Sequence, residues 1–204
     1  MQSIILASSS PRRKQLLEWA EVPFEVVVKS IEEDYPASLP AEDVPVFIAR
    51  QKAIEVNKFL DEAFHQQHAN KPILAADTVV VLGSQIIGKP ANRNDAIEIL
   101  QALSGKTHLV ITGVVIHYDN HEVAFSDITT VEFHPLTTKQ IEFYVDKYEP
   151  YDKAGAYAIQ EWIGVVGIKS VQGDFYNVMG LPVSRVVQEL ERLNGSFLVE
   201  KLIG

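Results

Sequence analysis

The chain has 204 residues, a formal net charge of −9 and no cysteine, and 47% of its residues are hydrophobic. The lack of cysteine excludes disulfides and thiolate metal sites, and the lack of a long apolar run or a signal-peptide pattern predicts a cytoplasmic protein without membrane contact. Its acidic balance argues against a grip on polymeric DNA or RNA, which needs a basic surface, but not against a small phosphorylated ligand.

The first candidate site is a turn between a strand and a helix. Residues 4–7 form an apolar run that predicts a buried strand, and Pro11 suits the first position of the next helix, with Ser10 as its N-cap. The turn carries three serines and is followed by two arginines: Ser8, Ser9, Ser10, Arg12 and Arg13. Free backbone N–H groups at a helix start and arginine forks both favour phosphate. This stretch predicts a phosphate cradle; an ordinary capped helix with a solvated basic face is the alternative.

An acidic loop and a long helix come next. Residues 24–28 predict a second strand, and the acids at 32–34, Glu33 among them, suit a hard metal ion such as Mg²⁺ unless they are simply solvated. Asp43 is a suitable N-cap for a helix that runs to about residue 64, with a buried stripe that ends near Ala63. Lys52 lies beside that stripe, either on the surface or leaning into a cleft. Residues 65–70 predict a loop.

An interrupted apolar strand is the most informative later segment. Residues 72–82 are of the kind buried on both faces of a sheet, yet Asp77 stands among them. Because a buried carboxylate is costly unless it is paired or bound to metal, Asp77 is a functional candidate. The alternative is a bulge where Asp77 caps backbone groups. Lys89 follows, held between Gly88 and Pro90 at the end of a predicted return strand.

The remaining elements alternate between helices and strands. We expect a helix capped by Asn92 or Asn94, a hairpin of residues 108–117 and 122–133 that turns near Asn120, and a helix opened by a capping box at Thr137. A second hairpin over residues 163–168 and 170–175 and a final helix after Pro182 follow. The mixture predicts one α/β domain over residues 1–204, bent into two lobes without a separable linker.

Seven short motifs together resemble the Maf family of nucleoside triphosphate pyrophosphatases. They are residues 7–13 (ASSSPRR), 76–78 (ADT), 88–90 (GKP), 104–108 (SGKTH), 152–157 (DKAGAY), 159–160 (IQ) and 177–182 (NVMGLP). They run in the family order, and the resemblance covers residues 3 to about 193. It implies an elongated, inosine-triphosphatase-like α/β fold, in which a mixed sheet bends around a deep cleft between two lobes, and it implies a homodimer.

The resemblance also implies a reaction, cleavage between the α and β phosphates with a divalent metal, Mg²⁺ or Mn²⁺. Glu33 and Asp77 match the acidic positions of the family and are expected to hold the metal, with Asp77 as the base; which carboxylate is base and which is ligand stays open. Cations on the phosphates lower the barrier to such a reaction, and the candidates are Arg13, Lys52 and Lys89. Lys153 and Asp174 are second-rank candidates for substrate contact.

Base selection follows from the subgroup. The sequence looks like the dTTP/UTP branch, where Arg12, Thr78 and Gln160 match the specificity positions, whereas the 7-methyl-GTP branch has Asp-Gln in place of Asp77-Thr78. The Gln160 amide can both donate to and accept from an imide edge, although that argument alone does not exclude purines. We therefore expect a house-cleaning hydrolase of pyrimidine triphosphates, including modified ones. The alternative is a nucleotide-binding regulator of cell division and septum formation that has little or no turnover.

Overall fold

The computed structural model describes the backbone of residues 3–64, 71–119 and 121–203, and the side chains of these residues except 63–64 and 194–203. The predicted loop over residues 65–70, Asn120 and the side chain of Ala63 lie outside this description. In chain order, the first half contains β1 (Ile4–Leu6), α1 (Pro11–Trp19), β2 (Phe24–Val26), α2 (Val44–Phe64), β3 (Ile73–Leu82), β4 (Gln85–Ile87) and α3 (Arg93–Leu103). The second half contains β5 (Thr107–Tyr118), β6 (His121–Phe133), α4 (Thr138–Tyr148), the 3₁₀ turns η1 (Pro150–Asp152) and η2 (Ala154–Ala156), α5 (Trp162–Gly167), β7 (Ile168–Gln172), α6 (Phe175–Met179) and α7 (Val183–Ile203).

One mixed sheet of seven strands organises the chain. Its order is β2-β1-β3-β5-β6-β7, with β4 on β3; β1 runs parallel to β2 and β3, and the other pairs are antiparallel. Strand β3 pairs with β5 along nearly its whole length, while its other edge pairs with β1 only as far as Leu74 and with β4 only from Val80. Within the described chain no strand covers the stretch between these points, and Asp77 and Thr78 lie in that gap.

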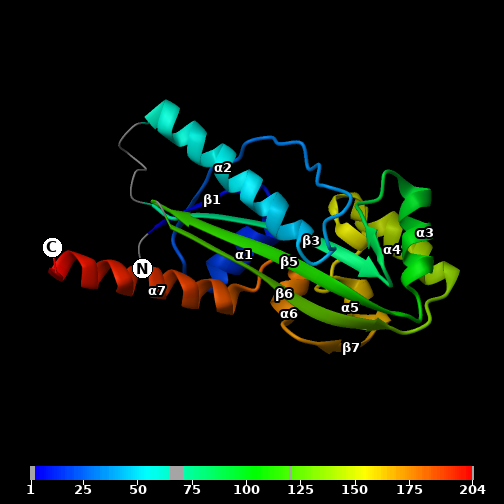
Figure 1. Ribbon diagram of the computed structural model, residues 1–204. Coiled ribbons are helices and arrows are strands. Elements are labelled where there is room, and N and C mark those ends of the chain that lie inside the picture. The colour runs from blue at the N-terminus through cyan, green and yellow to red at the C-terminus, as the bar shows by residue number, and fades with distance from the viewer. Residues whose placement is uncertain (1–2, 65–70, 120, 204) are drawn as a thin grey trace.

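Helices cover both faces of the sheet in an elongated molecule (Figure 1). Helix α2 packs on one face against β1, β3 and β5, while α1, α6 and α7 bury their apolar side chains on the other. Strand β3 is therefore buried on both faces, as its apolar run predicts. The start of α2 lies so close to β5 that a Cβ on Gly113 would be 2.2 Å from Val46 N and 2.3 Å from Pro45 C. Gly113 is the register partner of Asp77, so this contact sets α2 beside the candidate carboxylate.

A second group of helices closes the other end of the sheet. Helices α3 and α4 pack together, α3 also contacts η1 and η2, and η2 contacts β3. The caps are those predicted: Asn92 accepts from Asp95 N, and Thr137 forms a capping box with Gln140. The long strands β5 and β6 run from this end to the end that holds β1 and α7 (Figure 1). The predicted α/β class and elongated mixed sheet are confirmed.

One local prediction is wrong, and a second holds only in part. Residues 162–167 form helix α5 and residues 175–179 form α6, so β7 pairs with β6 instead of forming a second hairpin. A short apolar run does not distinguish strand from helix, and within this one Val165 is 80% exposed. Ser10 is the N-cap residue of α1, as predicted, but its side chain makes no capping hydrogen bond; its backbone N–H donates to Ser8 Oγ.

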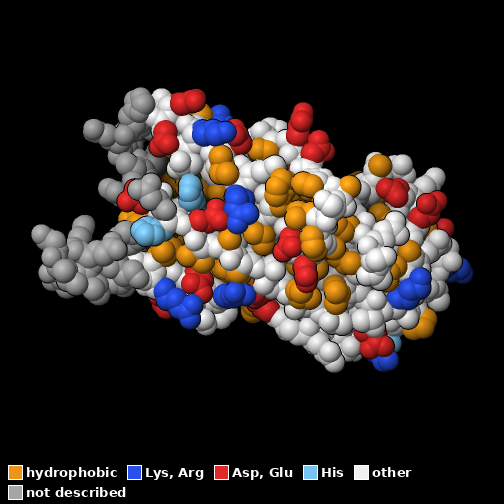
Figure 2. Space-filling view, in the orientation of Figure 1, with side chains coloured by type: hydrophobic (Ala, Val, Ile, Leu, Met, Phe, Trp, Pro, Cys, Tyr) orange, Lys and Arg blue, Asp and Glu red, His pale blue; other side chains and the backbone are white. Residues whose placement is uncertain are grey.

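The described surface is mixed in charge. On the face shown in Figure 2, acidic and basic side chains are interspersed with apolar ones. No helix among the described residues combines the length and hydrophobicity that crossing a membrane requires.

Candidate active site

A cavity of about 560 Å³ opens at the gap beside β3. It lies between the β1–α1 turn, the loop after β2, helix α2 and the segment that contains η1 and η2, and its volume is typical of a ligand site. Eleven of the residues predicted from sequence line it: Ser8, Ser9, Ser10, Arg12, Arg13, Glu33, Lys52, Asp77, Thr78, Lys89 and Lys153. The fold therefore brings together segments that are up to 145 positions apart in the sequence.

Ser8, the first serine of the turn, has a hydroxyl proton free to donate. Ser8 Oγ accepts from Arg13 Nη1 at 3.1 Å and from Ser10 N at 3.2 Å. A hydroxyl has two acceptor lone pairs and one proton, so both lone pairs are used. Among the described residues the Ser8 proton has no acceptor. Ser8 is thus set to donate to an anion in the cavity.

Arg13 is a buried anchor as well as a cation. Its side chain is 8% exposed, and besides Ser8 it donates from Nε to Gly180 O at 2.8 Å and from Nη2 to Thr78 Oγ1 at 3.1 Å. Burial lowers the pKa of Arg13, and the nearby Asp77 carboxylate acts in the opposite direction. The guanidinium stays charged near neutral pH, so the cavity wall carries a fixed positive charge.

A chain of hydroxyls holds Arg13 in place. Thr112 Oγ1 donates to the Asn177 carbonyl at 3.0 Å, and Thr78 Oγ1 lies 2.9 Å from Thr112 Oγ1. Since the only Thr112 proton is committed to that carbonyl, Thr78 must be the donor to Thr112. Thr78 then acts toward Arg13 as an acceptor. Neither Thr112 nor Asn177 was predicted, because nothing in a lone Thr or Asn signals a contact between distant segments.

Two carboxylates in the cavity share one lysine. Lys52 Nζ, at the edge of α2, lies 2.7 Å from Asp77 Oδ1 and 2.7 Å from Glu33 Oε1, and Lys89 Nζ lies 3.7 Å from Glu33 Oε2. Although burial raises the pKa of Glu33, the hydrogen bond and charge of Lys52, reinforced by Lys89, hold it below its usual value. Asp77 thus sits within a regular strand and is not the cap of a bulge.

The two carboxylates fit a hard metal ion that also binds phosphate. Both present oxygens to one ammonium nitrogen, so both face the same point. No group of three metal-ligating side chains occurs in the described part of the chain. Mg²⁺ is usually bound by one or two carboxylates together with water and substrate phosphates. Glu33 and Asp77 have the donor atoms that such a partial ligand set requires.

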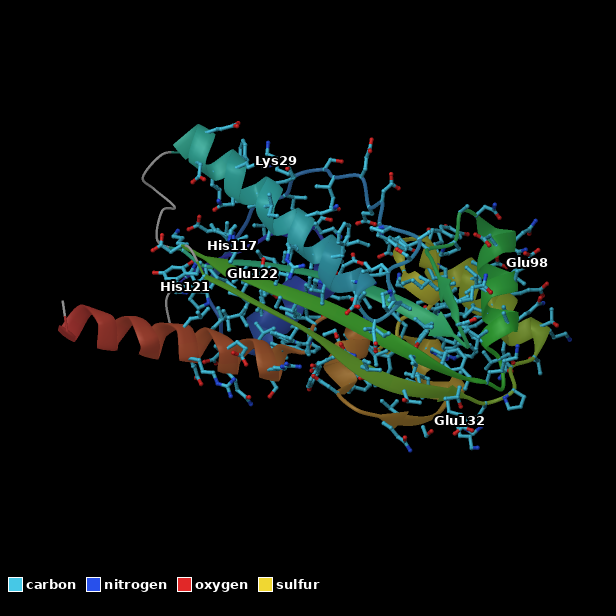
Figure 3. The ribbon with its side chains drawn as sticks, in the orientation of Figure 1. Lys29, Glu98, His117, His121, Glu122 and Glu132 are labelled. Carbon is cyan, nitrogen blue, oxygen red and sulfur yellow. The ribbon has the colours of Figure 1, made fainter. Side chains whose placement is uncertain are left out.

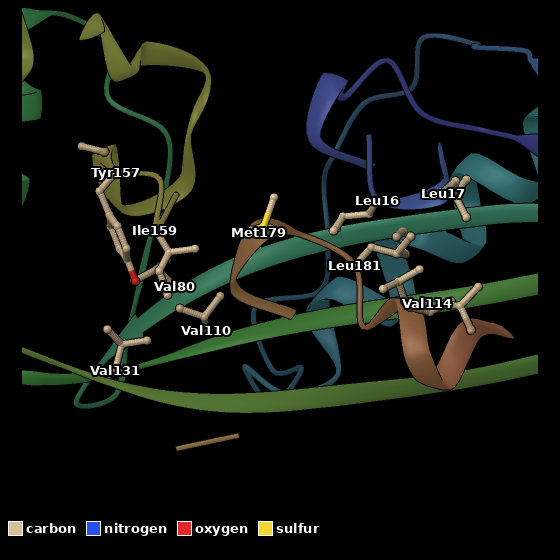
Figure 4. Close-up of a cluster of buried hydrophobic side chains, with 14 of the residues drawn as sticks. Leu16, Leu17, Val80, Val110, Val114, Val131, Tyr157, Ile159, Met179 and Leu181 are labelled. Carbon is tan, nitrogen blue, oxygen red and sulfur yellow. The ribbon is translucent and has the colours of Figure 1, made fainter. Parts of the chain in front are cut away.

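Part of the cavity wall is apolar. Val80, Val110, Met179 and Tyr157 are among its lining residues, and Figure 4 shows the same four side chains in the buried hydrophobic cluster. The Tyr157 hydroxyl lies 2.7 Å from His108 Nε2, and burial lowers the pKa of His108 to about 4. His108 is therefore neutral near pH 7, and it holds the tyrosine ring at the wall. This surface can pack against the flat face of a base or sugar.

An ion-pair network joins the two sides of the cavity. Arg12 Nη1 lies 3.3 Å from Asp152 Oδ2, and Lys153 Nζ lies 2.7 Å from Asp152 Oδ1 and 3.6 Å from Glu161 Oε1. Burial raises the pKa of Asp152, but Lys153 and Arg12 outweigh it and lower the pKa overall. Because Arg12 and Asp152 are partly exposed, their pair is worth at most about 1 kcal/mol. Arg12 can therefore exchange this partner for a phosphate.

Two predicted residues do not line the cavity. Gln160 is exposed, whereas its neighbours Ala158 and Ile159 are buried, and Asp174 Oδ1 caps α6 by accepting from Tyr176 N at 2.7 Å. Their substrate contacts stay predictions. The histidines at the hairpin end, His117 and His121, lie near the turn between β5 and β6 (Figure 3).

Comparison with known proteins agrees with these motifs. The family described as "Maf-like protein" matches residues 3–193. A relative from Cytophaga hutchinsonii is 47% identical over 190 residues, which cover 93% of this chain and 84% of the relative, and is named dTTP/UTP pyrophosphatase. Relatives with the same name from Parabacteroides distasonis (47% identical; 92% of this chain, 94% of the relative) and Porphyromonas gingivalis (45%; 92% and 92%) also match.

Among solved structures, the Ham1 protein of Staphylococcus aureus matches 65% of this chain and 72% of its own, at 15% identity and a TM-score of 0.43. The match to the family description covers nearly all of the chain and includes all eleven predicted residues that line the cavity. The chain belongs to the Maf family.

Proposed function

We propose that this chain hydrolyses dTTP and UTP to the nucleoside monophosphate and pyrophosphate with the help of Mg²⁺ or Mn²⁺. The observation that carries the proposal is the pair of carboxylates, Glu33 and Asp77, on one lysine in a cavity that also holds an arginine and a hydroxyl donor. The shared name of the relatives supports the choice of nucleotides.

The charges in the cavity suit a triphosphate. A nucleoside triphosphate carries about four negative charges, and its hydrolysis depends on cations that neutralise charge as it develops on the phosphate oxygens. Arg13 supplies a fixed charge, Lys52 and Lys89 supply mobile ones, and Ser8 donates a hydrogen bond. These groups would bind the phosphate chain and orient it toward the carboxylates.

The carboxylates have two tasks, metal binding and proton removal. When bound, the metal ion neutralises phosphate charge and lowers the pKa of its water. Glu33 is the more exposed carboxylate, and Lys52 and Lys89 keep it ionised as a ligand. Asp77 is buried on the rigid strand β3, and we assign it to accept the proton of the attacking water. In the nucleotide-free protein, Lys52 Nζ donates a hydrogen bond to Asp77 Oδ1 at 2.7 Å.

The base would lie against the apolar wall formed by Val80, Val110, Met179 and Tyr157. A flat pyrimidine buries its faces there, while polar groups at the rim read its edge. We retain Arg12, Thr78 and Gln160 as specificity residues; for Gln160 this requires the segment after η2 to turn toward the bound base. Homodimerisation and a cytoplasmic location belong to the same proposal, and sedimentation equilibrium tests the dimer.

The test is a product assay with dTTP, UTP, CTP, ATP, GTP and 7-methyl-GTP in the presence of Mg²⁺ or Mn²⁺. Pyrophosphate and monophosphate released fastest from dTTP and UTP support the proposal. Pyrophosphate released fastest from 7-methyl-GTP would support the pyrophosphatase reaction but would contradict the assignment to the dTTP/UTP branch. Nucleotide binding without turnover of any triphosphate would favour the alternative, a nucleotide-sensing regulator of cell division.

A further inference from the structure

Lys52 occupies the point at which Glu33 and Asp77 converge. Its ammonium is 2.7 Å from one oxygen of each carboxylate, and the lysine and Asp77 side chains are only 16% and 13% exposed. The two carboxylates come from different segments, the loop after β2 and the centre of β3. Two further cations among the described residues act on this pair: Lys89, which lies 3.7 Å from Glu33, and Arg13, whose charge interacts with both carboxylates. Lys52 contacts both carboxylates directly and so holds the two together.

The cluster has no excess of negative charge as it stands. Two carboxylates, Glu33 and Asp77, face two lysines, Lys52 and Lys89, and the Arg13 guanidinium adds a further positive charge nearby. A divalent cation that bound to both carboxylates would need the oxygens that Lys52 now occupies, and it would add two positive charges beside an ammonium. Repulsion between these cations in a partly buried site is strong. The ammonium and a metal ion are thus competitors for one position.

Glu33 and Asp77 are the ion-pair partners of Lys52 among the described residues, and a bound nucleotide would offer it another. It lines the same cavity as Ser8 and Arg13, where the phosphates would bind, and a lysine is a compact charge on a flexible stem. Phosphate oxygens can therefore replace the carboxylates as partners of the ammonium. Without phosphate, a Lys52 side chain that moved away from Glu33 and Asp77 would leave its positive charge unpaired.

We propose that Lys52 is an exchangeable counter-ion: it closes the carboxylate pair in the nucleotide-free protein and moves to the phosphates when a metal–nucleotide complex binds. This inference rests on the proposed function and adds a coupling to it. Lys52 weakens metal binding to the empty protein, and the nucleotide removes that obstacle. Metal and nucleotide then strengthen each other's binding, and by linkage the factor is the same in both directions.

The experiment measures Mn²⁺ binding by electron paramagnetic resonance, without nucleotide and with non-hydrolysable α,β-methylene-dUTP. In the wild type, we expect the analogue to tighten Mn²⁺ binding by roughly 5- to 150-fold, the usual range of such coupling. In Lys52→Met, the nucleotide-free protein should bind Mn²⁺ more tightly than the wild type, by about tenfold, and the analogue should add correspondingly less. Lys52→Gln is the second variant should Lys52→Met fail to fold.

Lys89→Met is the matched control, because it removes the same charge from a lysine that is 56% exposed and 3.7 Å from Glu33. Its effect on nucleotide-free Mn²⁺ binding should be clearly smaller. The proposed exchange is overturned if the nucleotide-free Lys52 variant binds Mn²⁺ as tightly as the wild type or more weakly. It is also overturned if the gain in Mn²⁺ affinity is no larger than in Lys89→Met. A wild type that binds no Mn²⁺ even with the analogue would instead refute the metal dependence of the proposed function.

Discussion

Arg13 gives the sharpest test of how the cavity is built, because it has three different protein acceptors. Its guanidinium donates to Ser8 Oγ, Thr78 Oγ1 and Gly180 O, which belong to the first turn, to β3 and to the segment after α6. Arg13→Lys keeps the charge but replaces a planar fork by a single ammonium. A lysine there cannot reach all three acceptors, so we expect it to keep at most one of the contacts.

The magnitude follows from the bonds lost. A hydrogen bond that involves a charged group contributes about 1.5–3 kcal/mol, and losing two of them in a buried setting predicts a fall of about 3–5 kcal/mol in the free energy of unfolding. For a chain of this size, that corresponds to a decrease in Tm of roughly 6–20 °C. The rate of dTTP hydrolysis should fall with it, because Ser8 and Thr78 lose their shared partner.

The assay is urea unfolding of Arg13→Lys beside Arg12→Lys. Arg12 makes one ion pair, with the partly exposed Asp152 at 3.3 Å, so its replacement should cost at most about 1 kcal/mol. If the two variants differ by less than about 1 kcal/mol, the three bonds of Arg13 do not hold the cavity together, and our reasoning about the anchor is wrong.

Two further predictions concern packing and pH. Gly113→Ala would place a Cβ 2.3 Å from Pro45 C and 2.2 Å from Val46 N, and it should destabilise the protein by about 1–3 kcal/mol and displace α2. Gly88→Ala is the control, because a Cβ there meets nothing within 4 Å. Equal stability of the two variants in urea would contradict the close contact at Gly113. Burial lowers the pKa of His108 from 6.5 to about 4, so its share of stability is complete above pH 6.5 and is lost as the pH falls from 6.5 through 4, by up to about 3 kcal/mol. The difference in unfolding free energy between wild type and His108→Gln should shrink over that window, and a constant difference would refute a neutral buried histidine.

Much of the fold was readable from local pattern. The apolar run around Asp77 predicts a strand buried on both faces, and both faces of β3 are indeed covered. The caps at Asn92 and Thr137 were predictable because capping depends on a few neighbouring residues. The helix at Trp162–Gly167 could not be predicted in this way. Its apolar run is too short to distinguish helix from strand, and packing in the folded chain determines which of the two forms.

In the candidate site, too, single residues could be predicted from local pattern, but their contacts could not. Asp77 was visible as a charge in an apolar strand, and Lys52 stood at the edge of a helical stripe, but their 2.7 Å contact depends on how α2 rests on the sheet at Gly113. The contact of Arg13 with Gly180 joins residues 167 positions apart. Long-range contacts of this kind are set by tertiary packing, and the sequence alone does not encode them in any local spacing.

The most direct test of the central claim is Asp77→Asn, which removes the proposed base and keeps the shape of the side chain. We expect the kcat for UTP to fall by about 100- to 10,000-fold. Tm and the affinity for α,β-methylene-dUTP, measured without metal, should stay near those of Asp146→Asn, a control on an exposed ion pair with Arg93. Full turnover in Asp77→Asn, with binding intact, would contradict the role of Asp77 in catalysis.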